Sequence, residues 1–348
     1  MFRFILRRLG ITVISVLCLT FVVFILTNLD GNLVKLAKFL GSQRMSAEQV
    51  DTWLDLNGFN QPDVIRYGEW LGVLPSYQLV QDDGKILGRC TRPGVSLEDT
   101  PRYCGIFQGN WGWSVIFREE VDSIIFKRLA LTGWLMLYVM LIMVSIALVI
   151  GILAGMREGT RTDRTLSTFS IITTATPEYV SGVLLVALFS SNAVGLKWFK
   201  GSAASAMENI TFENFTLPVA TMALYGMGYI ARMTRASMAE VMTSQYIRTA
   251  RLKGVSFTAI VLKHALRNAL IAPFTVIMLQ FPWLLTGVVI VETLFNYKGF
   301  GWTLVQAASN NDINLLLGCS IIAVIVVLIT QLISDIGYVF LNPRIRVS

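Results

Sequence analysis

The sequence has very few of the side chains that hold metals or perform catalysis. It contains one histidine, His264, and four cysteines among 348 residues. A zinc site needs three or four such ligands gathered together, so no metal site is predicted. Neither a G-x-x-x-x-G-K-[ST] phosphate-binding loop nor a G-x-S-x-G nucleophile motif occurs. We therefore expect no catalysis and no cofactor in this chain, and any energy input would have to come from a partner.

Charged residues are also scarce, at 15%, whereas 54% of residues are apolar and the mean hydropathy is +0.61. This balance is typical of an integral membrane protein rather than a soluble domain. A hydrocarbon core of about 30 Å needs about 20 helical residues to cross it. The stretches that meet this length are Leu9–Thr27, Leu129–Met156, roughly Thr165–Ser190, Asn214–Ala231, Asn268–Val291 and Ile313–Ser334. The prediction is an all-α integral membrane protein with six transmembrane helices.

Basic residues are unevenly distributed over the segments that join these stretches. Lysines and arginines outnumber acids in 1–8, 156–165, 231–268 and 341–348. Because short cytoplasmic loops carry the positive charge, we place these segments and both termini in the cytoplasm. The first stretch is expected to be a retained helix, since its apolar run is too long for a signal peptide. The basic sequence pI of about 9.3 then reflects topology, and nucleic-acid binding is not predicted.

In this topology residues 29–128 form one long external segment of globular composition. The stretch 46–59 is predicted to be a capped helix that begins at Ser46, with a glutamine three residues later completing a capping box. Residues 77–87 are predicted to form a β-hairpin around the turn Asp82-Asp83-Gly84.

Several single residues carry local predictions. Cys90 and Cys104 lie in the external segment, where oxidising conditions permit a disulfide, and two unpaired thiols are the alternative. Gly151 and Gly155 have the spacing that lets a second helix approach closely. Asp335 lies near the cytoplasmic end of the last helix and is expected to pair with a nearby arginine.

A basic loop without acids, 246–273, joins the fourth and fifth stretches. Gln245–Lys253 has helix-forming composition and stops at Gly254, and a second helix is predicted over Thr258–Ala269. Basic and apolar residues alternate at helical spacing, which suits either a surface that docks a partner or a loop that lies against lipid headgroups. Periodicity alone leaves both interpretations open.

The loop carries the pattern Tyr-x-Arg-Thr-Ala-Arg-x-Lys-Gly, followed by Lys-His-Ala-Leu-Arg-Asn-Ala-Leu and a proline. This pattern resembles the permease motif of bacterial ABC importers of the oligopeptide, dipeptide and nickel type. Segments similar to the family's follow in its order along nearly the whole chain: FRFILRRLG, NGFNQP, GNWGWS, MTRASMAEV, VETLFNYKGFGW and DIGYVFLNPRIR. Three features depart from the family pattern. Asn110 replaces its usual aspartate, Glu178 follows Pro177 where a small or polar residue is commoner, and 72–107 looks like an insertion.

The resemblance implies the type I permease fold of ABC importers, in three parts. Residues 1–28 would be the cytoplasmic N-terminus and first helix, and 29–128 a periplasmic domain with the insertion 72–107. Residues 129–348 would form a five-helix core with a cytoplasmic coupling loop at 244–268. The implied location is the bacterial inner membrane. The implied partners are a second homologous permease subunit, two ATP-binding subunits, a periplasmic solute-binding protein and membrane lipid.

The resemblance also implies that the loop docks the ATP-binding subunits, whose closure on ATP would drive alternating access. Ala250 and Gly254 would occupy the alanine and glycine of the family's EAA motif, and Arg248 stands where other importers often have glutamate. The residues expected to dock are Tyr246, Arg248, Thr249, Ala250, Arg251, Lys253, Gly254, Val255 and Ser256. Glu178 and Trp283 are candidates to line the pathway. Core packing is the alternative for Trp283, and pairing with a helix end or with Arg164 is the alternative for Glu178.

The transported solute is not specified by these motifs. Peptides are the expectation from the resemblance, and oligosaccharides, opines, glutathione and nickel chelates are alternatives. Two other function classes are an ATP-independent secondary transporter and a membrane scaffold. The first would be expected to show paired intramembrane acids or inverted repeats, and neither is visible in the sequence.

Overall fold

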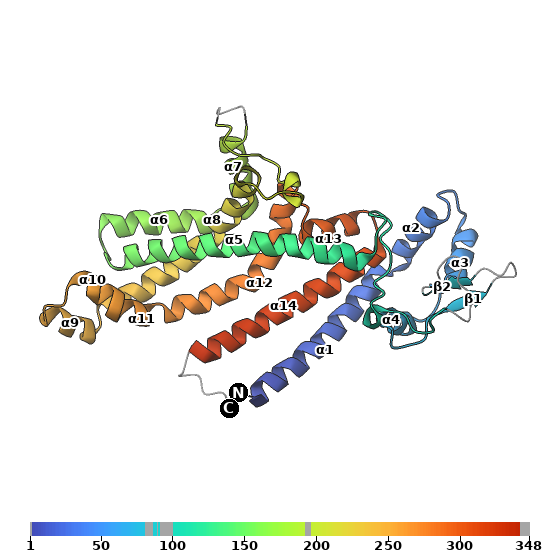
Figure 1. Cartoon of the computed structure of the whole chain (residues 1–348), viewed down its shortest axis with the longest axis horizontal. Coiled ribbons are helices and arrows are strands. Elements are labelled where there is room, and N and C mark those ends of the chain that lie inside the picture. The colour runs from blue at the N-terminus through green and yellow to red at the C-terminus, as the bar shows by residue number, and fades with distance from the viewer. Residues whose placement is uncertain (1, 81–85, 89, 91–99, 192–195, 342–348) are drawn as a thin grey trace. The chain divides into compact units, whose positions relative to one another are not determined.

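The computed structural model describes residues 2–80, 86–88, 90, 100–191 and 196–341. Helices dominate these residues, as the sequence predicts (Figure 1). The elements of the N-terminal part are α1 (Phe2–Thr27), α2 (Asp30–Leu40), α3 (Ala47–Leu56), α4 (Asp63–Leu71), β1 (Gln78–Val80), β2 (Ile86–Gly88), the 3₁₀-helix η1 (Ile106–Gln108) and α5 (Val121–Gly155). The remaining elements are α6 (Arg161–Ala175), α7 (Glu178–Phe189), the 3₁₀-helix η2 (Ala204–Met207), α8 (Phe212–Met242), α9 (Gln245–Leu252), α10 (Phe257–Ala259), the π-helix η3 (Ile260–Ala265), α11 (Leu266–Ala269), α12 (Ile271–Leu294), α13 (Phe300–Ser309) and α14 (Ile313–Leu341).

Within the described residues, three helices are long and apolar enough to cross a membrane: Leu6–Thr27 of α1, the whole of α5, and Ile313–Gly337 of α14. Two bent pairs raise the number to five if each counts as one span. These are α6 with α7, bent by 105°, and Phe257–Ala269 with Ile271–Leu285, bent by 52°. The first bend falls at Pro177, because proline has no amide donor and disfavours helix at the residue before it. An integral membrane protein is supported, and six spans stay a prediction.

Helix α8 is the predicted span that does not meet this test. It packs against α6, α7 and α12, and about half of its residues are buried. Because other helices rather than lipid cover much of its surface, α8 can carry glycine, threonine and tyrosine where a lipid-facing helix would need leucine or isoleucine.

The chain divides into two compact units. Unit 1 comprises Met1–Leu9, Leu129–Trp302 and Val327–Ser348, and unit 2 comprises Gly10–Arg128 and Thr303–Val326. In unit 1, α5 and α8 approach closely at the glycine pair, as predicted. A Cβ on Gly155 would lie 2.6 Å from the Cβ of Met238. Asp335 forms the expected ion pair with an arginine: its carboxylate lies 3.3 Å from the guanidinium of Arg8.

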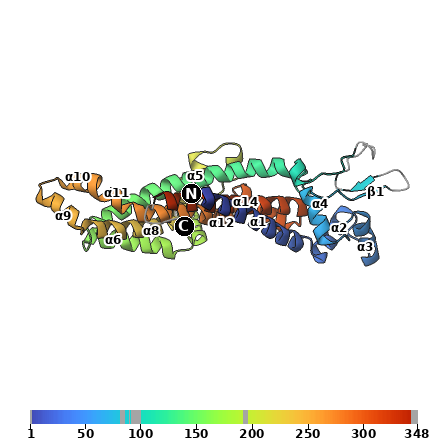
Figure 2. The same ribbon diagram turned by 90° about the horizontal axis from the view of Figure 1, so that it is seen from below.

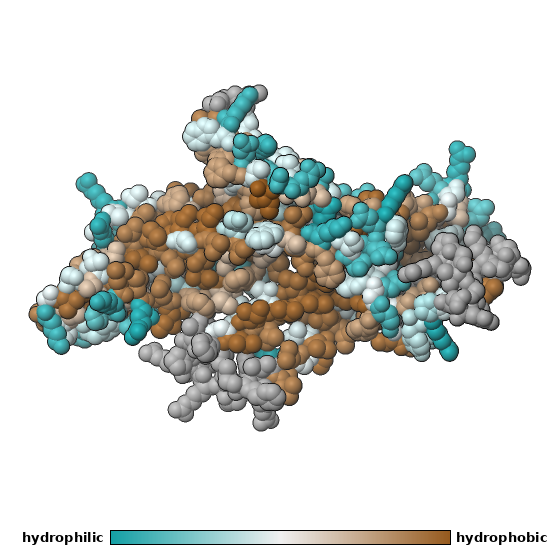
Figure 3. Space-filling view, viewed as in Figure 1, coloured by the Kyte–Doolittle hydropathy of each residue, from teal (hydrophilic) through white to brown (hydrophobic). Residues whose placement is uncertain are grey.

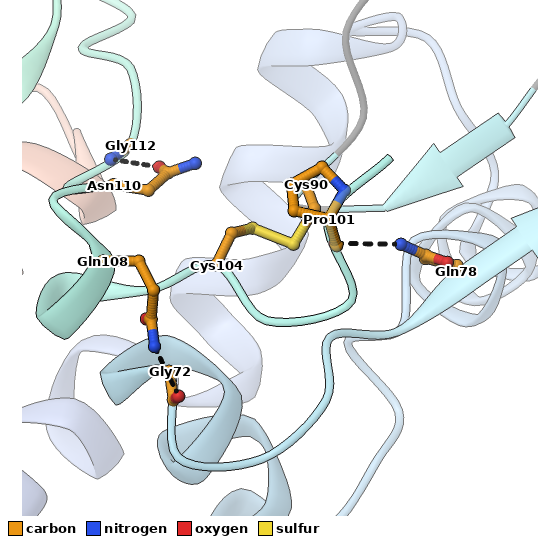
Figure 4. Close-up of a disulfide and its surroundings, with 8 residues drawn as sticks. All are labelled: Gly72, Gln78, Cys90, Pro101, Cys104, Gln108, Asn110 and Gly112. Atoms are coloured by element: carbon orange, nitrogen blue, oxygen red, sulfur yellow. Dashed lines mark hydrogen bonds between the residues drawn. A yellow bond between two sulfur atoms is a disulfide. The ribbon is translucent and has the colours of Figure 1, made fainter. Parts of the chain in front are cut away.

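Unit 2 contains the elements predicted for the external segment. Ser46 and Gln49 form the capping box at the start of α3, so this prediction is confirmed. Strands β1 and β2 pair in antiparallel register, while the turn Asp82-Asp83-Gly84 lies outside the described residues. The structure joins Cys90 and Cys104 in a disulfide with a Cα–Cα distance of 5.7 Å (Figure 4).

The GNWGWS segment, 109–114, is held by side-chain hydrogen bonds within unit 2. The Asn110 side-chain oxygen accepts from the Gly112 amide at 3.1 Å, so asparagine can make the turn that an aspartate would make (Figure 4). Ser114 donates to Asp312 at 2.6 Å, and Asp312 also accepts from the Leu315 amide at 3.2 Å. The buried Asp312 therefore caps α14 and ties the segment to that helix.

Candidate functional site

The basic loop folds into a compact knob, Gln245–Ala269, in which α9 is one wall. Both views show α9, α10 and α11 at the ends of α8 and α12 (Figures 1 and 2). Ile247 and Ala250, three residues apart on α9, are buried, with exposures of 0% and 9%. They pack into a small hydrophobic core with Met238, Ile260, Val261, Ala265 and Ala269. The knob therefore has an apolar core of its own, which it shares with the end of α8.

Gly254 ends α9 with a turn that only glycine adopts without strain. Its φ is +74°, in the left-handed region. The Gly254 amide bonds to the Arg251 carbonyl at 3.0 Å, and the Val255 amide bonds to the Ala250 carbonyl at 3.2 Å. These two bonds are the Schellman arrangement, in which the last carbonyls of a helix find donors. Val255 packs onto the knob core, so the predicted stop at Gly254 is confirmed and its cause is local.

The outward face of the knob combines cations with large exposed apolar side chains. Arg248, Arg251 and Lys253 are exposed on α9 and the turn after it. Leu252 is 82% exposed and Phe257 is 50% exposed. Hydrophobic and hydrophilic side chains accordingly mix at the end of the molecule that carries α9 (Figure 3). Such a mixture suits a surface that docks a protein partner, and it also suits a surface that lies against lipid headgroups.

The nine residues predicted to dock all lie on the knob, but not all on its surface. Ala250 is buried and Val255 is half-buried, so these two support the outward face from inside. The other seven are exposed. Leu252 and Phe257 were not among the predicted docking residues. The sequence feature that could have identified them is an apolar residue among charged ones: Leu252 lies on the charged side of α9, and Phe257 lies just after the turn at Gly254.

Polar contacts attach the knob and the neighbouring loop to α8. Ser237 of α8 donates to the carbonyl of Ala269 at 2.8 Å, and within the knob Asn268 donates to the Tyr246 hydroxyl at 2.9 Å. Arg235 forms a bidentate ion pair with the buried Asp163, donating hydrogen bonds of 3.0 and 2.8 Å to its two carboxylate oxygens. The hydrogen bond to this carboxylate raises the pKa of Arg235. The cation is therefore firmly held at the base of the knob.

The two residues predicted to line a pathway meet at one glycine. A Cβ on Gly287 of α12 would lie 3.3 Å from a Glu178 carboxylate oxygen and 3.7 Å from the Trp283 ring. Trp283 in turn stacks on Tyr225 of α8, with ring centroids 4.7 Å apart and planes inclined by 15°. All three side chains are half-buried. Glu178 begins α7, so it lies at a helix end, and among the described residues no ion pair joins it to Arg164. We call Glu178, Tyr225, Trp283 and Gly287 the α7–α8–α12 cluster.

Sequence reasoning did not single out Glu292, which is fully buried in unit 1. It accepts a hydrogen bond from Thr132 of α5 and another, at 2.8 Å, from the Trp302 amide. The Thr132 oxygen also accepts from the Phe300 amide at 2.8 Å. Glu292 thus joins α5, α12 and the start of α13. The sequence feature that could have drawn attention to Glu292 is that it is the first acidic residue after Glu240.

Within the described residues, no group of three or more His, Cys, Asp or Glu side chains is arranged to hold a metal ion. The candidate site consists of the exposed face of the knob and the half-buried α7–α8–α12 cluster.

Comparisons with known proteins agree on one family. The pattern described as "binding-protein-dependent transport system inner membrane component" matches residues 147–347. A probable peptide ABC transporter permease of Sinorhizobium fredii is 33% identical over 244 residues, which are 69% of this chain and 77% of that protein. Glutathione transport system permeases of Salmonella typhimurium and Escherichia coli K12 are each 34% identical over 69% of this chain and 76% of their own length.

Proposed function

Because this chain belongs to the family of binding-protein-dependent transport system inner membrane components, we propose that its knob docks a subunit that hydrolyses ATP. The chain is a permease subunit of an ABC importer for peptides or similar solutes. The observation that carries the docking proposal is the exposed Leu252, at 82%, among cations on a helix whose opposite face is fully buried. A surface of this kind needs an apolar partner groove with acidic rims.

The packing of the knob supports its role as a lever. Ile247 of α9 shares a core with Met238 of α8 and with Ala269, which ends α11 and leads into α12. A partner that pulls on α9 would therefore move the ends of α8 and α12 together, since packed cores transmit displacement rather than absorb it. Farther along, these helices hold the Trp283–Tyr225 stack. We propose that this movement opens and closes the pathway by alternating access.

The α7–α8–α12 cluster is the proposed contact with the solute. Intramembrane acids generally face protein or water, and Glu178 is half-buried. A Cβ on Gly287 would lie within 4 Å of both Glu178 and the Trp283 ring of the stacked pair. This combination suits a solute that carries an amino group and an apolar side chain. Relatives named for peptide and glutathione transport support that class, so we propose peptides as the solute and glutathione as the second candidate. Opines, oligosaccharides and nickel chelates are supported by no observation on this chain.

The proposed assembly contains this chain, a second homologous permease, two ATP-binding subunits and a periplasmic solute-binding protein in the bacterial inner membrane. This chain would contribute six spans, cytoplasmic termini, a periplasmic domain and half of the pathway. The family description supports an inner-membrane location and a binding-protein partner.

A pair of substitutions at Gly254 tests the docking proposal. A Cβ at this position would meet nothing within 4 Å, so alanine causes no clash inside the chain, and tryptophan adds a large side chain on the exposed surface of the turn. Both share the strain of a positive φ, which costs about 1–2 kcal/mol. Gly254→Ala should therefore retain uptake of a labelled dipeptide, and Gly254→Trp should abolish it while the protein remains in the membrane. Equal uptake by both variants would show that no partner docks on this surface.

A further inference from the structure

Unit 2 has an open depression on its surface, about 770 Å³ in volume, that the docking and pathway proposals do not use. Three segments distant in the sequence line it: one face of α2, the loop 115–118 before α5, and 308–311, which ends α13 and leads into α14. Small-molecule sites occupy about 300–1,000 Å³. The depression is therefore large enough for a small molecule or for the polar part of a larger one.

The depression lies where three apolar helices begin or end. The apolar parts of α1, α5 and α14 are each long enough to cross a membrane. Asn32 comes five residues after the first of these spans, Arg118 three residues before the second, and Asn311 two residues before the third. The polar layer on each side of the hydrocarbon core is about 5–8 Å thick. Residues this close to the ends of three spans are therefore expected at the level of the lipid headgroups.

The described lining contains two cations and no acid. Lys35 of α2 and Arg118 are both exposed, and neither side chain has an ion-pair partner within the ranges that the structure describes. Asp30 and Glu119, the acids nearest to them in the sequence, do not line the depression, and Glu119 lies 4.0 Å from Lys127. Because two cations are gathered without a compensating acid, this surface attracts an anion.

The loop that carries Arg118 is held by two buried side chains, Ser114 and Asp312. The Ile116 amide donates to the Asp312 carboxylate at 3.2 Å, and the Arg118 amide donates to the Ser114 carbonyl at 3.0 Å. Arg118 has a φ of +54°, in the left-handed region, where arginine is uncommon. Because the backbone is fixed in this conformation, the position from which the guanidinium extends is fixed before a ligand arrives.

The neutral part of the lining suits a lipid better than a phosphate ion. Asn310 and Asn311 each donate a side-chain hydrogen bond to a backbone carbonyl, while their amide oxygens accept none among the described residues. These oxygens can accept from a headgroup hydroxyl. Phe39, at 63% exposed, and Ile116, at 36%, also line the depression. Exposed apolar side chains beside cations are typical of a surface that meets the membrane interface.

We propose that this depression binds an anionic phospholipid whose headgroup carries hydroxyl groups, of the phosphatidylglycerol class. The phosphodiester would lie between Lys35 and Arg118, because lysine and arginine are the usual donors to phosphate oxygens. A headgroup hydroxyl would reach the asparagine oxygens, and apolar parts of the lipid would contact Ile116. A lipid held in this way would brace α2 against the starts of α5 and α14. The inference rests on the spans and on the lining of the depression, and not on docking at the knob.

The test measures lipid binding to the purified full chain in detergent by native mass spectrometry, with dioctanoyl phosphatidylglycerol as the probe. One saturable adduct is expected. Dioctanoyl phosphatidylcholine should bind at least about tenfold more weakly, because its headgroup has no net charge and no hydrogen-bond donor. Glycerol phosphate, which has the same chemistry without acyl chains, should also bind at least about tenfold more weakly, because no apolar surface is buried.

Two substitutions connect the adduct to the depression. Arg118→Gln and Lys35→Gln should each weaken phosphatidylglycerol binding about fivefold, the contribution of one basic residue near an anionic lipid surface. Lys35 lies on a regular helix, so Lys35→Gln keeps the test decisive if Arg118→Gln fails to fold. Arg44→Gln is the matched control, since Arg44 is exposed in unit 2, carries the same charge and does not line the depression. Its affinity should equal that of the unaltered chain.

Three comparisons can overturn the proposal. Equal affinity for phosphatidylglycerol and phosphatidylcholine would do so, as would equal affinity of Lys35→Gln and Arg44→Gln. Equal affinity for glycerol phosphate and the lipid would indicate a site for soluble phosphates instead. Absence of a saturable adduct would also overturn the proposal and would leave the depression to an acidic protein. Because the test contains no nucleotide and no partner protein, its failure leaves the docking proposal standing.

Discussion

Replacing Ile247 by alanine should release α9 from the knob, whereas the same change at Leu252 should not. Both residues are aliphatic and lie on one helix, but Ile247 is fully buried and Leu252 is 82% exposed. Truncating a buried isoleucine to alanine costs about 2–5 kcal/mol. Surface substitutions stay within about 0.5 kcal/mol. At about 1.4 kcal/mol per factor of ten, local opening of α9 should become roughly 30- to 4,000-fold more frequent in Ile247→Ala, and change about twofold at most in Leu252→Ala.

Hydrogen exchange of the α9 amides, followed by mass spectrometry on the full chain in nanodiscs, measures this opening. Capture of the ATP-hydrolysing subunit by the same samples measures docking. Leu252→Ala should weaken capture while exchange stays as in the unaltered chain, because it changes only the outward face. Ile247→Ala should accelerate exchange first and weaken capture as a consequence. Equal exchange in the two variants would refute the assignment of an inner and an outer face to α9.

The other predictions concern close packing, the solute and the disulfide. Gly155→Ala should destabilise the chain by about 1–3 kcal/mol, because the new Cβ meets Met238. Gly133→Ala, in the same helix with nothing within 4 Å, should stabilise it by up to about 1 kcal/mol in thermal unfolding. Glu178→Gln should leave folding intact and reduce uptake of a cationic relative to a neutral dipeptide by about fivefold, the factor for roughly 1 kcal/mol of charge attraction; unchanged selectivity would place Glu178 outside the pathway. Cys104→Ser should destabilise unit 2 by about 3 kcal/mol, since the bridge joins cysteines separated by 14 residues. Hydrogen exchange across unit 2 detects this change, and an unaltered exchange pattern would contradict it.

Local signals made the knob and the start of α3 predictable. The helix-forming run, the glycine stop and the capping box at Ser46 each depend on residues within one or two turns of each other. The inward position of Ile247 and the outward position of Leu252 were not predictable in the same way. Alternating basic and apolar residues over eight positions give apolar side chains on more than one face, and only the packing against Met238 decides which face is inside.

Long-range features were the ones that sequence reasoning missed. Glu292 is recognisable as a buried hub only when Thr132, 160 residues away, is seen to donate to it. The depression in unit 2 is lined by segments as distant as Asn32 and Asn311, so its lining becomes visible only once the chain has folded.

The docking proposal depends on whether the knob binds an ATP-hydrolysing partner. The direct measurement is copurification of that subunit with the tagged full chain from membranes, comparing the unaltered chain with Leu252→Glu. We expect the subunit to copurify with the unaltered chain and to be lost from Leu252→Glu, which puts a charge where an apolar contact is expected, while the variant remains folded and in the membrane. Retention of the subunit by a folded Leu252→Glu, or its absence from the unaltered chain, would refute docking at the knob.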